Sequence, residues 1–212
     1  MTRIDVWSDV VCPWCYIGKR HLEQALAGLP DADDVEVVWH SYQLDPSAPV
    51  GGGGSVVASL AEKYGVGTAQ VLVMQQRVTD AAAAAGLEYH LEHTRDGNSL
   101  DAHRVLHLAA SRGLQAEVKE RLFRAHFTEG ASVFDHEELT RLAVEAGLDA
   151  EEVRGVLAGD AYADGVAADL AQARAYGISS VPFFVVDARL GVAGAQPPAV
   201  LRQAIEQARA QG

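Results

Sequence analysis

The sequence Cys12-Pro13-Trp14-Cys15 constrains this chain most, because it contains both cysteines and joins a strand-like segment to a helix-like one. Residues 3–7 alternate with period two, as a half-buried strand does, and apolar side chains recur at helical spacing between residues 22 and 29. The first cysteine is therefore predicted to lie where a helix begins.

That position predicts a reactive dithiol. The first turn of a helix leaves backbone N–H groups unpaired and carries the positive end of the helix dipole, which favours a thiolate. Cys12 is therefore the predicted nucleophile, and Cys15, three residues later on the same helix face, is predicted to resolve its disulfides. Pro13 suits the first helical position, and Pro13 and Trp14 occupy the places between the cysteines that tune their reactivity.

Two other uses of the cysteine pair are weaker. A disulfide staple closing about four residues stabilises a fold by roughly 2 kcal/mol, against about 3 kcal/mol for fifteen residues, so a stabilising staple is better placed elsewhere. A structural zinc site needs four ligands, and the chain has only two cysteines, so histidines would have to supply the others. Redox chemistry is therefore favoured, and no metal is predicted.

The segment from Cys12 to Lys19 (CPWCYIGK), after a strand that ends Trp7-Ser8-Asp9, resembles the DsbA family of thioredoxin-fold oxidoreductases, and within it the FrnE-like cytosolic branch. Further matching stretches follow in the same order along almost the whole chain: residues 42–46, 63–65, 98–104, 127–130, 177–184 and 194–196. The resemblance implies a thiol–disulfide oxidoreductase of the oxidase or isomerase type that acts on protein or small-molecule thiols and disulfides. It implies no cofactor beyond the redox-active disulfide, with glutathione as a candidate redox partner.

The resemblance also implies further site residues. It implies a cis bond between Val181 and Pro182 that faces the dithiol, with the Val181 backbone free to pair with an extended substrate; a trans proline that starts a strand is the alternative. Asn98, His103 and Arg104 fall in a matching stretch and are candidates for substrate binding. A polar helix face or a helix cap explains these three residues about as well.

The order of elements predicts an α/β chain with a thioredoxin-like fold and an inserted all-helical subdomain. Strands are expected at residues 3–7, 35–40, 181–187 and 190–194, and the first two, with the helix between them, form a βαβ unit. Further helices are expected at residues 55–63, 68–85, 99–111, 115–127, 137–146, 150–157, 160–176 and 197–210. Residues 1–50 and 160–212 would form the thioredoxin-like domain and residues 55–159 the insertion.

The glycine run at residues 51–54 follows Pro46 and Pro49 and predicts a flexible loop. It lacks the Lys-Ser/Thr pair and the strand–helix context of a phosphate-binding loop. A linker is therefore the favoured interpretation of this run.

Composition limits the partners. The chain has 17 basic and 29 acidic residues in 212, and its net charge of −12 opposes nonspecific binding to nucleic acid or an anionic membrane. No apolar run approaches the roughly 18–20 residues of a membrane span, and no apolar segment of a secretory signal precedes the first strand. A cytoplasmic location is expected, where a dithiol is more often catalytic or redox-sensing than structural. The oligomeric state is not predicted.

Two alternatives to disulfide exchange stay open. The kappa-type glutathione transferases and the 2-hydroxychromene-2-carboxylate isomerases share the inserted thioredoxin architecture, but they usually have serine where Cys12 stands and lack a resolving cysteine. They use glutathione as a bound cofactor. The second alternative is a noncatalytic binding module that uses the apolar cleft.

Overall fold

The computed structural model describes residues 1–210 and divides into two compact units. The first unit consists of Met1–Leu44 together with the described residues from Ala167 onward, and the second consists of Asp45–Val166. The sequence predicted the boundaries between the two units at residues 50–55 and 159–160, whereas the structure divides them after Leu44 and after Val166.

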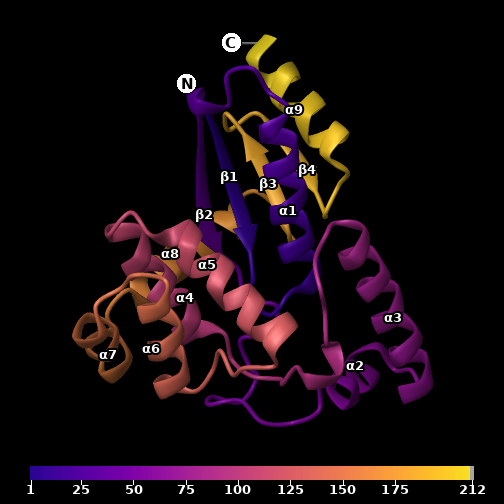
Figure 1. Cartoon of the computed structure of the whole chain (residues 1–212), viewed down its shortest axis with the longest axis vertical. Coiled ribbons are helices and arrows are strands. Elements are labelled where there is room, and N and C mark those ends of the chain that lie inside the picture. The colour runs from indigo at the N-terminus through magenta and orange to yellow at the C-terminus, as the bar shows by residue number, and fades with distance from the viewer. Residues whose placement is uncertain (211–212) are drawn as a thin grey trace. The chain divides into compact units, whose positions relative to one another are not determined.

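The first unit is built on a four-stranded sheet with the strand order β2-β1-β3-β4. Strand β1 (Thr2–Ser8) runs parallel to β2 (Val35–Ser41) and antiparallel to β3 (Phe183–Val186), which pairs antiparallel with β4 (Leu190–Ala193). Figure 1 shows the four strands side by side. The dithiol segment follows directly from β1, an inner strand of this sheet.

Helices α1 (Pro13–Ala27) and α9 (Pro198–Ala210) lie next to each other over one face of the sheet (Figure 1). Alternate residues of the strands point to this face, as the two-residue period of a strand requires. The apolar core between sheet and helices consists of Ile4, Val6, Leu22, Ala25, Leu29, Trp39, Phe184, Val186, Leu201, Ile205 and Ala208. This core fixes α1 on the sheet and therefore fixes the start of α1, where the cysteines lie.

Trp7 belongs to the opposite face of the sheet. It is the register partner of His40, whereas its neighbour Val6 is the partner of Trp39. The indole Nε1 of Trp7 donates to the carbonyl of Asp169 at 3.1 Å, and its rings stack on the imidazole of His40 with centroids 4.5 Å apart. Asp169 lies in helix α8 (Ala163–Ala175), so this polar and aromatic contact joins α8 to the sheet.

His40 is held between two carboxylates. Its Nδ1 lies 2.8 Å from Oδ1 of Asp169, and its Nε2 lies 2.7 Å from Oδ1 of Asp5. The other oxygen of Asp169 accepts the backbone N–H of Ser41 at 2.7 Å. Burial lowers the pKa of His40, but the hydrogen bonds to Asp169 and Asp5 outweigh burial and raise the pKa overall. The charged imidazolium, which donates from both nitrogens, is thus the form that the site favours.

The second unit is helical. It contains α2 (Val56–Tyr64), α3 (Thr68–Ala84), α4 (Leu100–Ser111), α5 (Gln115–Arg124), α6 (His136–Glu145) and α7 (Ala150–Ala158), with the short turns η2 (Leu91–His93) and η3 (Ala125–Glu129); the first unit has one such turn, η1 (Ala32–Asp34). The side chains of Asp135 and Asp149 accept backbone N–H groups at the starts of α6 and α7, as capping residues do. Buried aromatic and aliphatic side chains fill the unit, among them Val105, Leu122, Phe123, Phe127, Phe134, Leu139 and Leu142.

Several element boundaries differ from the sequence-based expectation for local reasons. The α-helix expected at residues 115–127 ends at Arg124, and its last turn, η3, has π-helical hydrogen bonding. The helix expected from residue 160 begins only at Ala163, after Tyr162 in a left-handed backbone conformation (φ 66°). Strand β3 begins at Phe183 rather than residue 181, because Pro182 has no N–H for the ladder.

The glycine run at residues 51–54 is packed within the second unit rather than running free as a linker. The N–H of Gly53 donates to the carbonyl of Asp96 at 2.9 Å. A Cβ on Gly52 would lie 2.8 Å from Cδ2 of Phe134, so this backbone approaches the ring too closely for any side chain. No helix within residues 1–210 is both long and apolar enough to cross a membrane.

The His40 contacts predict a pH-dependent stability. A group whose pKa is raised by folding stabilises the fold fully below its unfolded pKa of about 6.5, and this contribution is lost as pH rises through the folded pKa. We expect His40→Gln to lower the free energy of unfolding by about 3 kcal/mol at pH 6, and by clearly less at pH 9. Urea unfolding of both proteins at the two pH values measures this difference.

His93→Gln is the matched control, because the side chain of His93 is 65% exposed. It is expected to change the free energy of unfolding little at either pH. A His40→Gln effect that is equal at pH 6 and pH 9 would contradict a charged imidazole at this position.

Candidate active site

The two cysteines lie at the start of α1. Cys12 is the N-cap residue with an extended backbone, and Pro13 is the first residue of the helix. The N–H of Cys15 donates to the carbonyl of Cys12 at 3.0 Å, which closes the first turn. Both side chains are buried, and the sulfurs are not joined by a disulfide. The expected position of Cys12 at the beginning of a helix is confirmed.

Asp9 stabilises the loop that carries Cys12 through hydrogen bonds to backbone N–H groups. Its buried carboxylate accepts the backbone N–H of Leu44 at 2.8 Å and that of Val11 at 3.4 Å. Its carbonyl accepts the N–H of Cys12 at 3.2 Å. A single residue therefore connects the segment after β2 with the segment before α1. Sequence reasoning assigned Asp9 no role, although an acidic residue three positions before Cys12 is a visible signal.

Val181 and Pro182 face the dithiol. The peptide bond between them is cis, and the thiol of Cys12 lies 3.6 Å from the carbonyl oxygen of Val181. The carbonyl of Pro182 accepts the N–H of Gly194 at 2.8 Å, so the segment is also fixed to the far end of β4. A substrate that pairs with the Val181 backbone would thus lie beside Cys12.

Gly18 permits this arrangement. A Cβ at Gly18 would lie 2.7 Å from Cγ of Pro182 and 3.3 Å from Cζ of Phe184. Only a residue without a side chain lets α1 approach the proline this closely. Sequence reasoning placed Gly18 in the matching motif without giving it a role, because the contact joins residues far apart in the chain.

Pro13 and Trp14 lie between the two cysteines. Pro13 lacks an N–H, and the side chain of Trp14 is 42% exposed although it is large and apolar. An exposed indole next to a dithiol offers an apolar contact to a substrate. The tuning role of Pro13 and Trp14 stays a prediction.

Asn98, His103 and Arg104 belong to the second unit, where internal contacts occupy Asn98 and Arg104. The amide of Asn98 donates to the carbonyl of Pro46 at 2.8 Å, and its oxygen accepts the N–H of Leu100 at 2.9 Å. His103 is fully buried in α4. Their substrate role stays a prediction.

The guanidinium of Arg104 ties α4 to the residues around the end of α7. It donates to the carbonyls of Ala161 at 2.9 Å and Gly159 at 2.5 Å, to the carbonyl of Val156, and to Asp101 at 2.7 Å. These contacts give the buried charge the hydrogen bonds that it needs within the unit. Arg104 therefore has a structural function whatever its role in substrate binding.

Within residues 1–210, no three or more histidine, cysteine, aspartate or glutamate side chains are grouped so that they could hold a metal ion. The chemistry available at this site is that of two thiols, the backbone around them and an exposed indole.

The chain belongs to the DSBA-like thioredoxin domain family, which matches residues 3–206. Its four-stranded sheet with a helical insertion is the thioredoxin-like fold of that family. This membership makes it an enzyme of the thiol–disulfide oxidoreductase class.

Three similar proteins give the range of this likeness. A probable DsbA oxidoreductase from Streptomyces coelicolor, SCO1869, is 45% identical, with a TM-score of 0.95 over 100% of this chain and 92% of that chain. The uncharacterized protein YwbO from Bacillus subtilis (strain 168) is 29% identical over 191 residues, which cover 87% of this chain and 86% of YwbO. The cytosolic disulfide reductase DsbM from Pseudomonas aeruginosa, solved with GSH, is 19% identical, with a TM-score of 0.66 over 99% of this chain and 96% of DsbM. This last likeness describes the fold alone.

The Gly18 contact predicts a strong effect of a single methyl group. We expect Gly18→Ala to lower the free energy of unfolding by about 1–3 kcal/mol, because Pro182 and Phe184 cannot give way without moving α1. The same movement should expose Cys12 and speed its alkylation by iodoacetamide. Gly155→Ala is the control, since Gly155 lies in α7 with no atom within 4 Å of its added Cβ. That variant should gain up to about 1 kcal/mol, and equal stabilities of the two variants would refute the contact.

Arg104 predicts a stability effect in the second unit. We expect Arg104→Met to lower the free energy of unfolding by about 3 kcal/mol, because carbonyls and a carboxylate lose a charged donor. Arg154→Met is the control: Arg154 pairs with Glu151 at a site where its side chain is 61% exposed, and the change should be below about 1 kcal/mol. Urea unfolding measures both, and similar effects of the two variants would contradict the structural role of Arg104.

Proposed function

We propose that the chain catalyses thiol–disulfide exchange with Cys12 as the nucleophile and Cys15 as the resolving thiol. The observation that carries the proposal is the position of Cys12 at the N-cap of α1, 3.6 Å from the carbonyl of Val181 beside the cis proline. The Val181 backbone beside Cys12 offers an extended substrate a pairing edge.

The proposed reaction has two exchange steps. The Cys12 thiolate attacks one sulfur of a substrate disulfide, which forms a mixed disulfide and releases the other substrate sulfur as a thiolate. The Cys15 thiolate then attacks the Cys12 sulfur, which forms the Cys12–Cys15 disulfide and releases the second substrate thiolate. The enzyme dithiol loses two electrons and the substrate disulfide gains them; oxidation of a substrate dithiol is the reverse sequence.

The exposed face of Trp14 suggests an apolar part in the substrate. Protein disulfides and small-molecule disulfides both fit this description, and glutathione is the proposed redox partner. The reductase DsbM was solved with GSH, which supports glutathione without assigning it. We also propose that the chain needs no further cofactor and that it is cytoplasmic, as the cytosolic disulfide reductase DsbM is named to be.

The direction of the reaction depends on the reduction potential of the pair. Known dithiol enzymes extend from about −270 mV to about −120 mV, which corresponds to roughly 7 kcal/mol for two electrons. Neither Pro13 nor Trp14 fixes a value in this range. Equilibration of the protein in glutathione buffers, followed by alkylation of the free thiols, gives the potential directly. A value near −270 mV would assign a reductase, and one between about −180 and −120 mV would assign an oxidase or isomerase.

Substitution of each cysteine tests the two roles. We expect Cys15→Ser to accumulate a mixed disulfide with one glutathione when it is treated with glutathione disulfide, because the attack on Cys12 still occurs but resolution does not. Cys12→Ser should accumulate none. Intact-protein mass spectrometry counts the added glutathione, and exchange turnover should fall at least about 100-fold in both variants.

The same two variants distinguish disulfide exchange from the two alternative functions. A glutathione-dependent isomerase or transferase needs no resolving thiol, so its turnover would survive Cys15→Ser. A noncatalytic binding module would keep its ligand affinity in Cys12→Ser and show no turnover in the unmodified chain. Exchange turnover that persists undiminished in Cys15→Ser would overturn the proposed role of Cys15.

A further inference from the structure

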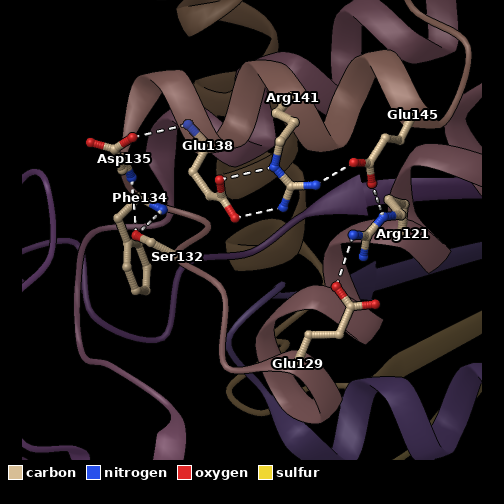
Figure 2. A network of polar contacts seen from close by, with 8 residues as sticks. All are labelled: Arg121, Glu129, Ser132, Phe134, Asp135, Glu138, Arg141 and Glu145. Carbon is tan, nitrogen blue, oxygen red and sulfur yellow. Dashed lines mark hydrogen bonds and ion pairs between the residues drawn. The ribbon is translucent and has the colours of Figure 1, made fainter.

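The second unit contains a cavity that the dithiol chemistry does not use. Its volume is about 340 Å³, within the roughly 300–1,000 Å³ of small-molecule sites. It is lined by Gly51, Gly52, Arg95, Gly130, Ser132, Asp135 and Glu138. Figure 2 shows the last three residues from close by.

The walls of this cavity are fixed by packing. Gly52 lies against Phe134, and a Cβ on Gly130 would lie 2.8 Å from Cβ of His93. The hydroxyl of Ser132 accepts the N–H groups of Phe134 at 3.3 Å and Asp135 at 3.2 Å, as Figure 2 shows. Gly52 and Gly130, which have no side chains, thus face the turn that the hydroxyl of Ser132 stabilises.

The negative charge of Glu138 is already compensated. Its two oxygens accept hydrogen bonds from the guanidinium of Arg141 at 2.6 Å and 3.0 Å (Figure 2). These bonds lower the pKa of Glu138. Arg141 also bonds Glu145, which in turn bonds Arg121. This chain of ion pairs leads away from the cavity, so Glu138 contributes little net charge to it.

Two other charges have no ion-pair partner. Asp135 uses one oxygen to accept the N–H of Glu138 at 2.9 Å, and its carboxylate forms no ion pair within residues 1–210. The guanidinium of Arg95 is exposed and, in the described part of the chain, makes neither a hydrogen bond nor an ion pair. Arg95 and Asp135 therefore line one cavity with opposite charges that do not neutralise each other.

This combination of charges suits a zwitterion. A guanidinium binds a carboxylate through two parallel hydrogen bonds, and a carboxylate oxygen accepts an ammonium donor. A phosphate dianion would instead meet the uncompensated carboxylate of Asp135. We propose that the cavity binds the α-amino-acid group of a small ligand, with Arg95 holding its carboxylate and Asp135 its ammonium group.

Calorimetric titration of the full chain tests this proposal. The probes are L-glutamate, for a free amino acid, and S-methylglutathione, whose γ-glutamyl end has the same group but whose blocked thiol cannot exchange with the cysteines. Binding of either probe supports the proposal and identifies the source of the group. Acetate and methylamine, which each carry one of the two charges, should bind at least tenfold more weakly than the zwitterion.

Three variants locate the binding. Arg95→Gln removes the cation, and Asp135→Asn removes the negative charge while keeping a residue that caps α6 equally well. Each should weaken binding of the zwitterion at least tenfold. Arg77→Gln is the control, because Arg77 is an exposed arginine of α3 outside the cavity. Unchanged affinity in Arg95→Gln and Asp135→Asn, binding of inorganic phosphate in preference to L-glutamate, or no binding of either zwitterion would overturn the proposal.

Discussion

The close contact between Gly18 and Pro182 determines the geometry of the candidate active site. It lets α1 lie against the segment that precedes β3, which brings the Val181 carbonyl to 3.6 Å from the Cys12 sulfur. The apolar core beneath α1 and α9 fixes the rest of α1 on the sheet. Because interiors are close-packed, the position of the first turn, and with it the dithiol, follows from contacts made further along the helix.

Buried carboxylates secure the segments around that turn. Asp9 fixes the loop before Cys12 through backbone N–H groups. The carboxylate of Asp169 ties α8 to His40 and Ser41 of β2, and its backbone carbonyl accepts the indole N–H of Trp7. Buried polar groups are costly unless their hydrogen bonds are satisfied, so each of these networks holds its partners in one arrangement. Beside the dithiol, the indole of Trp14 stays exposed.

The two units offer different chemistry. The first has thiols, a helix N-terminus and a backbone edge, which suit covalent exchange with an extended substrate. The second contains several arginine–carboxylate pairs, whereas Arg95 and Asp135 line one cavity and, within residues 1–210, take part in none of them. Family membership accounts for the first set of features, whereas the second set depends on side chains that the dithiol reaction does not require.

The sequence by itself predicted much of this protein, because the informative patterns are local. A two-residue period, helical spacing and turn residues sufficed for the strands, most helices and the position of Cys12 at a helix start. The Asp135 and Asp149 caps were predictable for the same reason, since a cap bonds to residues two or three positions away.

Only the tertiary structure decided the contacts between residues distant in the chain. The approach of Gly18 to Pro182, the carboxylates on both sides of His40 and the packing of the glycine run against Phe134 each join segments that no local pattern relates. The structure also revealed that Arg104 donates hydrogen bonds to the carbonyls of residues more than fifty positions away in the chain, whereas the sequence left open a role in substrate binding. Local propensity is encoded in neighbouring residues, but the partner of a buried charge or a missing side chain is set by how the whole chain packs.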